Sequence, residues 1–402
     1  MNAIGIVAEF NPFHNGHSYL IRKTREKFPD SVIVAVMSGN FVQRGEAAFE
    51  DKWRRSSVAV KNGVDLVVQL PTRFSNASSY FFAYGAMEIL TSLNVGTVVF
   101  GSESGDTDRL GIIAEFLTEH FDDVNKYAAL RTKEGITFPR AREEYLNDFF
   151  SAYEKCHNMN CDMETSKKEL TGGSCYAFPP NEILAIDYMI AGNLLGYDGS
   201  FYSFKRSGDG HNESASKIRR EYYSKNPDKE KHYEDTLYKL IVGKISASKT
   251  EKKRKMLPEN CRYAEEELYN RTLNRWRYTK NLEELEDELV SKSYTRARVR
   301  RFFISYVLGN YTLHKEDILS FNAVYPLAFN DKGASYLKFI KKIGISHLDF
   351  IHKVSPDHVR HDECQSLDII AHEEIVATDV YNLLRGNDFY EYSEFVKKPE
   401  KI

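Results

Sequence analysis

His14 and His17 lie three positions apart near the start of the chain, with glycine between them at position 16. Apolar residues before this pair predict a buried strand over 4–10, and the pattern after it predicts a helix over 16–27. A loop in that position directs both imidazoles and the free N–H groups of the helix toward one point. Such a set of donors suits the negative charge that develops when an α-phosphate is attacked. The alternative is a pair of ordinary loop histidines.

A second anion site is predicted where hydroxyl and guanidinium groups begin a later helix. The residues over 214–220 are Ser-Ala-Ser-Lys-Ile-Arg-Arg, with Arg219 about one turn into the helix. A guanidinium group there would hold a leaving pyrophosphate through paired hydrogen bonds, which an ammonium group cannot form. Taken alone, the segment indicates only a helix cap. Its combination with the histidine loop indicates a phosphate clamp.

The elements that position these residues alternate along the first hundred residues. Short, nearly continuous apolar runs predict buried parallel strands, and amphipathic runs between them predict helices. The strands are expected over 4–10, 32–37, 66–70 and 98–100, and the helices over 16–27, 51–62 and 78–93. This alternation is typical of a Rossmann-like, doubly wound α/β fold. Because ligands bind beyond the carboxyl ends of such strands, the loops at 14–17, 38–40 and 101–105 are expected to meet in one site.

The rest of the chain predicts a second, mostly helical region. Helices are expected over about 110–146 and 182–195, with a strand over about 199–204. Residues 150–178 are polar and look like an insertion. We therefore predict a nucleotide-binding domain over 1–225, interrupted at about 150–178, and a helical domain over 226–402.

Composition excludes several protein classes. The chain has 402 residues, a net charge of −3 and five scattered cysteines. The charge indicates no partner, and the odd cysteine count favours reduced thiols in a cytoplasm. Neither a signal peptide nor a membrane-spanning run is predicted. Cys156, His157, Cys161 and Cys175 suggest zinc, but their spacing is uncommon for a zinc site, so no metal site is predicted.

The first histidine loop and the later Ile-Arg turn match the two signatures of the nucleotidyltransferase superfamily. Within it, the chain resembles the bacterial tRNA(Met) cytidine acetate ligase family. The segments that carry this resemblance are 9–17, 37–46, 51–55, 100–103, 180–184, 205–206 and 293–301. The resemblance extends over most of the chain and weakens at 150–178 and near 325–329.

The resemblance implies an enzyme that activates acetate with ATP, giving acetyl-adenylate and pyrophosphate. It then implies transfer of the acetyl group to N4 of the wobble cytidine of elongator tRNA(Met), giving N4-acetylcytidine. ATP would be a substrate accompanied by Mg²⁺. No membrane association and no obligatory protein partner are expected.

The resemblance also implies ATP-binding residues. They are Val7, Ala8, Glu9, Phe10, Asn11, Pro12, Phe13, His14, Asn15, Gly16, His17, Ser18, Tyr19, Leu20, Gly101, Asn181 and Arg206. We expect His14, His17 and Arg219 to be catalytic: the histidines donate to the α-phosphate, and Arg219 acts with Arg206 on the outer phosphates. The Asn181 amide would contact the adenine edge or the ribose.

Two basic clusters predict tRNA contacts. One contains Lys252, Lys253 and Arg254, and the other contains Arg296 and Arg300, which lie one helical turn apart. Such clusters bind phosphate backbones in a salt-dependent way, although a solvated helix face has the same pattern. For Arg44 two alternatives remain. It binds a ligand, which would be acetate, phosphate or RNA, or it is an ordinary arginine in a surface loop.

Two other functions fit parts of the sequence. A small-molecule adenylyltransferase that forms a dinucleotide product would share both signatures, but such enzymes usually lack a large basic helical region. A non-catalytic RNA-binding protein with a relic nucleotide pocket is disfavoured by the intact signature residues.

Overall fold

The computed structural model describes residues 1–156, 178–206, 215–248, 266–309, 323–344, 349–351, 353–354 and 366–402. The predicted tRNA-binding residues Lys252, Lys253 and Arg254 lie outside the described residues, as does Ser214. Nearly all of the predicted insertion, including three of the four candidate zinc ligands, lies outside them too.

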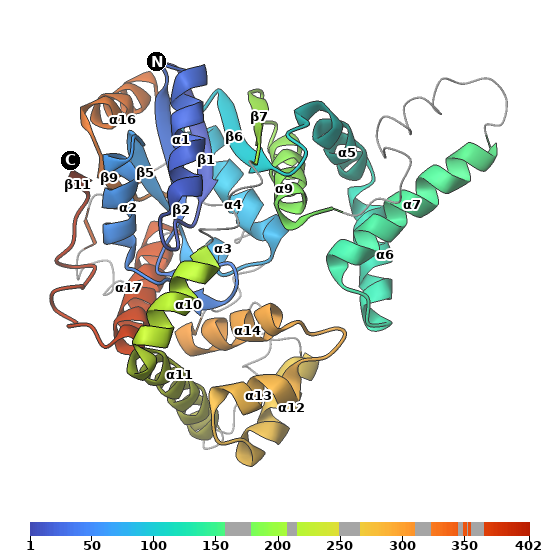
Figure 1. Ribbon diagram of the computed structural model, residues 1–402, viewed down its shortest axis with the longest axis vertical. Helices are drawn as coiled ribbons and strands as arrows, with labels where there is room; N and C mark the ends of the chain where they lie inside the picture. The colour runs from blue at the N-terminus through green and yellow to red at the C-terminus, as the bar shows by residue number, and fades with distance from the viewer. Residues whose placement is uncertain are drawn as a thin grey trace.

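A seven-stranded sheet forms the centre of the molecule (Figure 1), in the order β11-β9-β5-β2-β1-β6-β7. Five adjacent strands of this sheet are mutually parallel. They are β5 (Leu66–Leu70), β2 (Val32–Ser38), β1 (Ala3–Ala8), β6 (Thr97–Ser102) and β7 (Ser200–Lys205). These match the predicted strands and confirm the doubly wound α/β fold. β1 ends two residues before the predicted end because Phe10 adopts a positive φ of 46°, which is not an extended conformation.

Strand order reverses around β1. The chain passes from β1 to β2 and β5 on one side and then returns to place β6 on the other side. A doubly wound sheet binds ligands beyond the carboxyl ends of its strands at such a reversal. The loop after β1 carries the two histidines, and the loop after β6 begins beyond Ser102, so both predicted loops lie at this position.

Helices connect the parallel strands. α1 (Asn15–Lys27) follows β1 and lies across the sheet in Figure 1, and α2 (Lys52–Lys61) precedes β5. The short α3 (Thr72–Ser75) and then α4 (Ser79–Ser92) precede β6, and α4 packs against α9 (Pro180–Leu194). Between β6 and α9, the chain forms α5 (Thr107–Glu119), α6 (Phe121–Lys133) and α7 (Phe138–Cys156), of which α6 and α7 extend away from the sheet.

The later chain is not only helical, and the predicted boundary after residue 225 does not separate it from the sheet. β9 (Pro326–Phe329) pairs antiparallel with β5, and β11 (Glu400–Lys401) pairs with β9. α16 (Asp331–Ile343) packs against the same edge. The prediction missed these strands because β9 is short and its partner lies about 260 residues earlier in the chain. A further pair, β8 (Ala323–Val324) and β10 (Asp349–Phe350), is also parallel.

The remaining helices are α10 (Ala215–Lys225), α11 (Pro227–Ser248), α12 (Glu266–Arg275), a 3₁₀ turn (Trp276–Tyr278), α13 (Leu282–Leu289), α14 (Arg296–Leu308) and α17 (Ser366–Arg385). All of them except α10 contribute side chains to a second hydrophobic core. The hairpin of β3 (Phe41–Val42) and β4 (Glu46–Ala47) follows β2 in the chain, yet its apolar side chains belong to this helical core. The hairpin therefore joins the carboxyl edge of the sheet to the helical region.

Within the described residues, no helix combines the length and apolar character needed to cross a lipid bilayer.

Candidate active site

The two imidazoles lie against each other at the start of α1. Their ring centroids are 3.8 Å apart and their planes differ by 26°. His14 is the N-cap residue of α1, and its Nδ1 accepts a hydrogen bond from the backbone N–H of Gly16 at 3.1 Å. His17 Nδ1 accepts from the backbone N–H of His14 at 3.2 Å. Both histidines thus cap the helix reciprocally.

These caps decide which ring nitrogens can act as donors. A ring nitrogen that accepts a hydrogen bond carries no proton, so in the neutral form the proton of each ring lies on Nε2. Burial lowers the pKa of His17 to about 3, with further lowering from His14 and Arg206. His17 is consequently neutral at physiological pH. Its Nε2–H group can therefore donate a hydrogen bond, and the ring carries no positive charge.

A cavity of about 140 Å³ opens beside this pair. It is lined by Glu9, Phe10, Asn11, His14, His17, Val42, Arg44, Glu46, Ala215, Ser216 and Arg219. Its walls come from the loop after β1, the β3–β4 hairpin and the first turn of α10. The two signatures predicted to form a phosphate site are therefore brought together. Arg44 lines the same cavity, which favours a ligand contact over an ordinary surface position.

Arg219 is held at the cavity wall by the loop that carries the histidines. Its NH1 donates to the backbone carbonyl of Asn11, and NH2 lies 3.4 Å from the hydroxyl of Ser216. The Asn11 side chain in turn accepts from the backbone N–H of Phe49 at 2.6 Å. The guanidinium is thus oriented before any ligand arrives, which reduces the entropy lost on binding.

Three further residues predicted to bind ATP meet at the ends of β6 and β7. They are Gly101, Asn181 and Arg206. Asn181, in the first turn of α9, donates to Glu103 Oε1 at 2.6 Å and accepts from NH1 of Arg206 at 3.2 Å. A Cβ added to Gly101 would lie 3.4 Å from the Arg206 side chain. These contacts join Gly101, Asn181 and Arg206 into one group. The group lies close enough to the histidines for the charge of Arg206 to lower the pKa of His17. Among the predicted ATP-binding residues, Val7, Ala8, Phe13 and Leu20 pack against the main core.

A buried arginine fixes the loops around the site. Arg55 is fully buried on α2, and its guanidinium donates to the backbone carbonyls of Glu9 at 2.6 Å and Ser38 at 3.1 Å, and also to Gly39. One side chain therefore holds the carboxyl ends of β1 and β2 together. The sequence predicted the helix over 51–62 that carries this arginine but did not indicate its partners, because they are carbonyl groups that any residue supplies.

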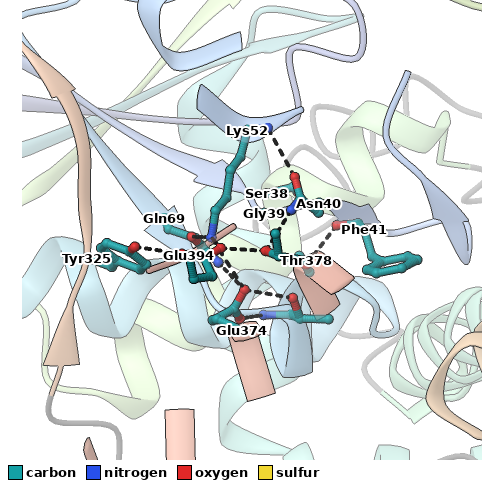
Figure 2. A network of polar contacts seen from close by, with 12 residues as sticks. Ser38, Gly39, Asn40, Phe41, Lys52, Gln69, Tyr325, Glu374, Thr378 and Glu394 are labelled. Atoms are coloured by element: carbon teal, nitrogen blue, oxygen red, sulfur yellow. Dashed lines mark hydrogen bonds and ion pairs between the residues drawn. The ribbon is translucent and has the colours of Figure 1, made fainter. Parts of the chain in front are cut away.

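A second buried network anchors the hairpin side of the site (Figure 2). The Lys52 ammonium, which has no exposed surface, forms an ion pair with Glu394 and donates to Gln69 Oε1 at 2.7 Å. Glu374 on α17 accepts from the backbone N–H of Thr72 at 2.6 Å.

The network reaches the loop after β2 through Asn40. Its side chain donates to Thr378 at 2.9 Å and accepts from the backbone N–H of Lys52 at 3.1 Å. Thr378 donates in turn to Glu394. Figure 2 shows how this loop is tied to the C-terminal part of the chain. No local pattern indicated these partners, which are more than 300 residues apart in sequence.

The predicted tRNA-binding arginines of α14 are engaged by carboxylates. Arg296 pairs with the buried Glu286 at 2.6 Å and with Asp287. Arg300 pairs with Glu286 at 2.7 Å and with Glu46 of the cavity at 2.5 Å. Both arginines are therefore already paired with carboxylates, which neither the predicted tRNA contact nor the alternative of a solvated helix face indicated. Their contact with tRNA remains a prediction.

No three His, Cys, Asp or Glu side chains converge as metal ligands in the ranges that the structure describes. The arrangement offers hydrogen-bond donors and guanidinium groups for anions instead.

Comparisons with known proteins identify the family to which this chain belongs. The family described as HIGH Nucleotidyl Transferase matches residues 1–393. A tRNA(Met) cytidine acetate ligase of Caldicellulosiruptor saccharolyticus is 34% identical over 364 residues, which cover 85% of this chain and 86% of the relative. The chain belongs to the tRNA(Met) cytidine acetate ligase family. Another member, from Clostridium acetobutylicum, is 32% identical over 375 residues, covering 85% and 88% of the two chains.

Solved structures of this family share the fold along the whole chain. The Thermotoga maritima TmcAL structure with bound alpha-thio ATP has a TM-score of 0.77 and 26% identity, with 100% of both chains covered. The apo form I of the same protein has a TM-score of 0.79 at 26% identity and equal coverage. The first of these neighbours binds an ATP analogue, and the family assignment made from the sequence motifs is confirmed.

Proposed function

We propose that this enzyme forms acetyl-adenylate from acetate and ATP and transfers the acetyl group to N4 of the wobble cytidine of elongator tRNA(Met). The observation that carries the proposal is the capped imidazole pair facing a cavity shared with Arg219. The names of the relatives supply the tRNA(Met) cytidine and the acetate. The neighbour with a bound ATP analogue supports ATP as the nucleotide.

In the first half-reaction, a carboxylate oxygen of acetate attacks the α-phosphorus of ATP, and the bond to the bridging oxygen of pyrophosphate breaks. The Nε2–H groups of His14 and His17 donate to the α-phosphate oxygens as negative charge increases there. Because both rings are fixed by backbone caps, little reorganisation is needed during the reaction. No covalent bond to the enzyme is required, since acetate is the nucleophile.

The outer phosphates would lie toward the guanidinium groups. Arg219 is fixed by the carbonyl of Asn11 at the cavity wall, and Arg206 is fixed by Asn181. Glu103 and Asn181 would receive the adenosine, since carboxylate and amide groups bind ribose hydroxyls and the adenine edge. Mg²⁺ would arrive on the phosphates of ATP, because the described residues offer no cluster of carboxylates to hold it.

The helical region would carry the tRNA. Arg296 and Arg300, together with Lys252, Lys253 and Arg254, are the basic residues we propose for backbone contacts. The two arginines of α14 lie on the helix that contacts the hairpin of the cavity, so RNA bound there would be close to the site of acetyl transfer.

The test is ATP-dependent incorporation of radiolabelled acetate into tRNA. Elongator and initiator tRNA(Met) are compared with ATP present or omitted, and the products are digested to nucleosides. Label in N4-acetylcytidine from the elongator tRNA alone is expected. Absence of label in both tRNAs, with ATP still bound, would instead favour a small-molecule adenylyltransferase, and mononucleotide acceptors would be tested next.

A further inference from the structure

Glu9 places a carboxylate in a cavity built for anions. It directly follows β1, and its Oε1 accepts from the backbone N–H of Gln43 at 2.8 Å. The side chain is half-buried and lines the same cavity as His14, His17 and Arg219. The hydrogen bond to the hairpin fixes one carboxylate oxygen at the cavity wall.

This placement is unfavourable for the first half-reaction alone. ATP, acetate and pyrophosphate are all anions, and a carboxylate among them repels each one. The second carboxylate of the cavity, Glu46, is neutralised by Arg300 at 2.5 Å. Glu9 has no ion pair within 4 Å among the residues that the structure describes, although the charges of Arg44, Arg55 and Arg219 act on it.

The acceptor in the proposed reaction differs from the other substrates because its reacting atom carries N–H groups. The exocyclic amine of cytosine is a donor, and carboxylates are its ordinary protein partners. We propose that Glu9 accepts a hydrogen bond from the N4 amine of the acceptor cytosine and takes the proton that this amine loses on acetylation. This inference rests on the proposed function and assigns the residue that serves its second half-reaction.

The step balances as follows. The N4 lone pair attacks the carbonyl carbon of acetyl-adenylate, and the bond from that carbon to the phosphate oxygen breaks, releasing AMP. One N4–H bond breaks, and its proton passes to the Glu9 carboxylate and afterwards to water. No oxidant, reductant or further co-reactant is needed.

The surroundings of Glu9 make its carboxylate a stronger base than that of an ordinary glutamate. Burial raises its pKa, and this effect exceeds the lowering by the Gln43 N–H and the three arginines. The other groups with charge or protons that face the cavity are His14, His17 and Glu46 on the same and neighbouring loops, and Tyr188 of α9 also senses the Glu9 charge. A carboxyl group with a raised pKa is a better proton acceptor than an ordinary glutamate.

The experiment compares Glu9→Gln with the parent in two assays. Acetate-dependent ATP–pyrophosphate exchange, with trapping of acetyl-adenylate by hydroxylamine, reports the first half-reaction. Acetyl transfer to elongator tRNA(Met) reports both. Glutamine keeps an oxygen for the Gln43 N–H but cannot take a proton, so we expect transfer to fall about a hundredfold or more and hydroxamate formation to fall at most about tenfold. Glu9→Asp, which keeps a carboxylate, should retain more transfer than Glu9→Gln.

Two control variants test the position. Glu46→Gln changes the other cavity carboxylate and should lower transfer less than Glu9→Gln. Glu50 does not line the cavity and pairs with Arg54. Glu50→Gln should therefore behave as the parent in both assays. The acid limb of the transfer rate against pH should be present in the parent and absent in Glu9→Gln.

Equal losses in both assays, or an unchanged ratio of transfer to hydroxamate, would overturn the role of Glu9. Failure of the parent to exchange pyrophosphate with acetate would instead overturn the proposed function.

Discussion

The NH1 atom of Arg300 lies 2.5 Å from Oε1 of Glu46, which connects helix α14 to the hairpin that lines the cavity beside His14 and His17. The turn of the hairpin also lies against the backbone of α14 next to this ion pair. Gly45 has a positive φ of 78°, and NH1 of Arg301 donates to the carbonyl of Gln43 at 3.1 Å. The helix proposed to bind tRNA and the proposed site of acetyl transfer are thus joined by direct contacts.

Gly45→Ala should break this contact. The added Cβ would lie 2.3 Å from the backbone nitrogen of Arg301 and 2.5 Å from the carbonyl carbon of Arg300, which is far inside contact distance. We expect the free energy of unfolding to fall by about 2–4 kcal/mol in urea titrations, with loss of acetyl transfer.

Gly196→Ala is the matched control. Gly196 also has a positive φ, of 66°, but an added Cβ would meet no atom within 4 Å. It should therefore lose only about 1 kcal/mol, the cost of the backbone conformation. Equal losses in the two variants would show that the approach of α14 contributes nothing at Gly45.

Arg219→Lys should slow formation of acetyl-adenylate by about tenfold or more. Lysine keeps the positive charge but loses the planar group that contacts the Asn11 carbonyl and that we propose also binds a phosphate. The measurement is acetate-dependent ATP–pyrophosphate exchange. Arg220→Lys, at an exposed neighbouring position, should leave the rate near that of the parent. A normal rate in Arg219→Lys would remove Arg219 from the phosphate site.

His17 should make stability depend on pH. Its pKa is lowered to about 3 in the folded protein, mainly by burial, from an ordinary value of 6.5. Between these values the unfolded chain binds more protons, so stability falls as the pH decreases from about 6.5 toward 3, by up to about 1.4 kcal/mol per pH unit. His17→Gln should remove this contribution, which is measured as the difference between the two proteins in urea unfolding across that range. Parallel pH curves for the two proteins would contradict a buried, neutral His17.

His14→Ala and His17→Ala should each slow adenylate formation by several tens-fold or more, because each removes one donor to the α-phosphate. Pyrophosphate exchange measures this step without tRNA. Near-normal exchange in both variants would eliminate the imidazoles from catalysis.

Lys52→Met should destabilise the protein by about 3–5 kcal/mol, because it leaves Glu394 and Glu374 buried without a cation. The double variant Lys52→Met with Glu394→Gln removes one of the stranded charges. It should recover at least about half of the loss in denaturant titrations. A single variant that loses less than about 1 kcal/mol would mean that water or structural change reaches these carboxylates.

Local pattern was sufficient for much of the α/β sheet and for its ligand-binding edge. β2, β5 and β6 could be read from apolar runs because a strand buried on both faces has a continuous apolar sequence. His14 and His17 could be read because the strand before them, the loop and the helix after them are adjacent in the chain. That Arg219 would join the histidines in one site was predicted from the combination of the two sequence signatures, because the sequence does not show contacts.

Long-range partners required the tertiary structure. Arg55 binds carbonyl groups, which every residue has, and Lys52 meets Glu394 across more than 300 residues. β9 completes the sheet through backbone pairing with β5, which depends on position rather than on side-chain type. Arg296 and Arg300 show the same limit: their charge and spacing are evident in the sequence, but only the fold places Glu286 and Glu46 beside them. The sequence by itself determined the strand-loop-helix unit and its donors, because these depend on neighbouring residues. The tertiary structure alone decided which charges are paired and which, such as that of Glu9, face the cavity, because electrostatic interaction depends on distance in space.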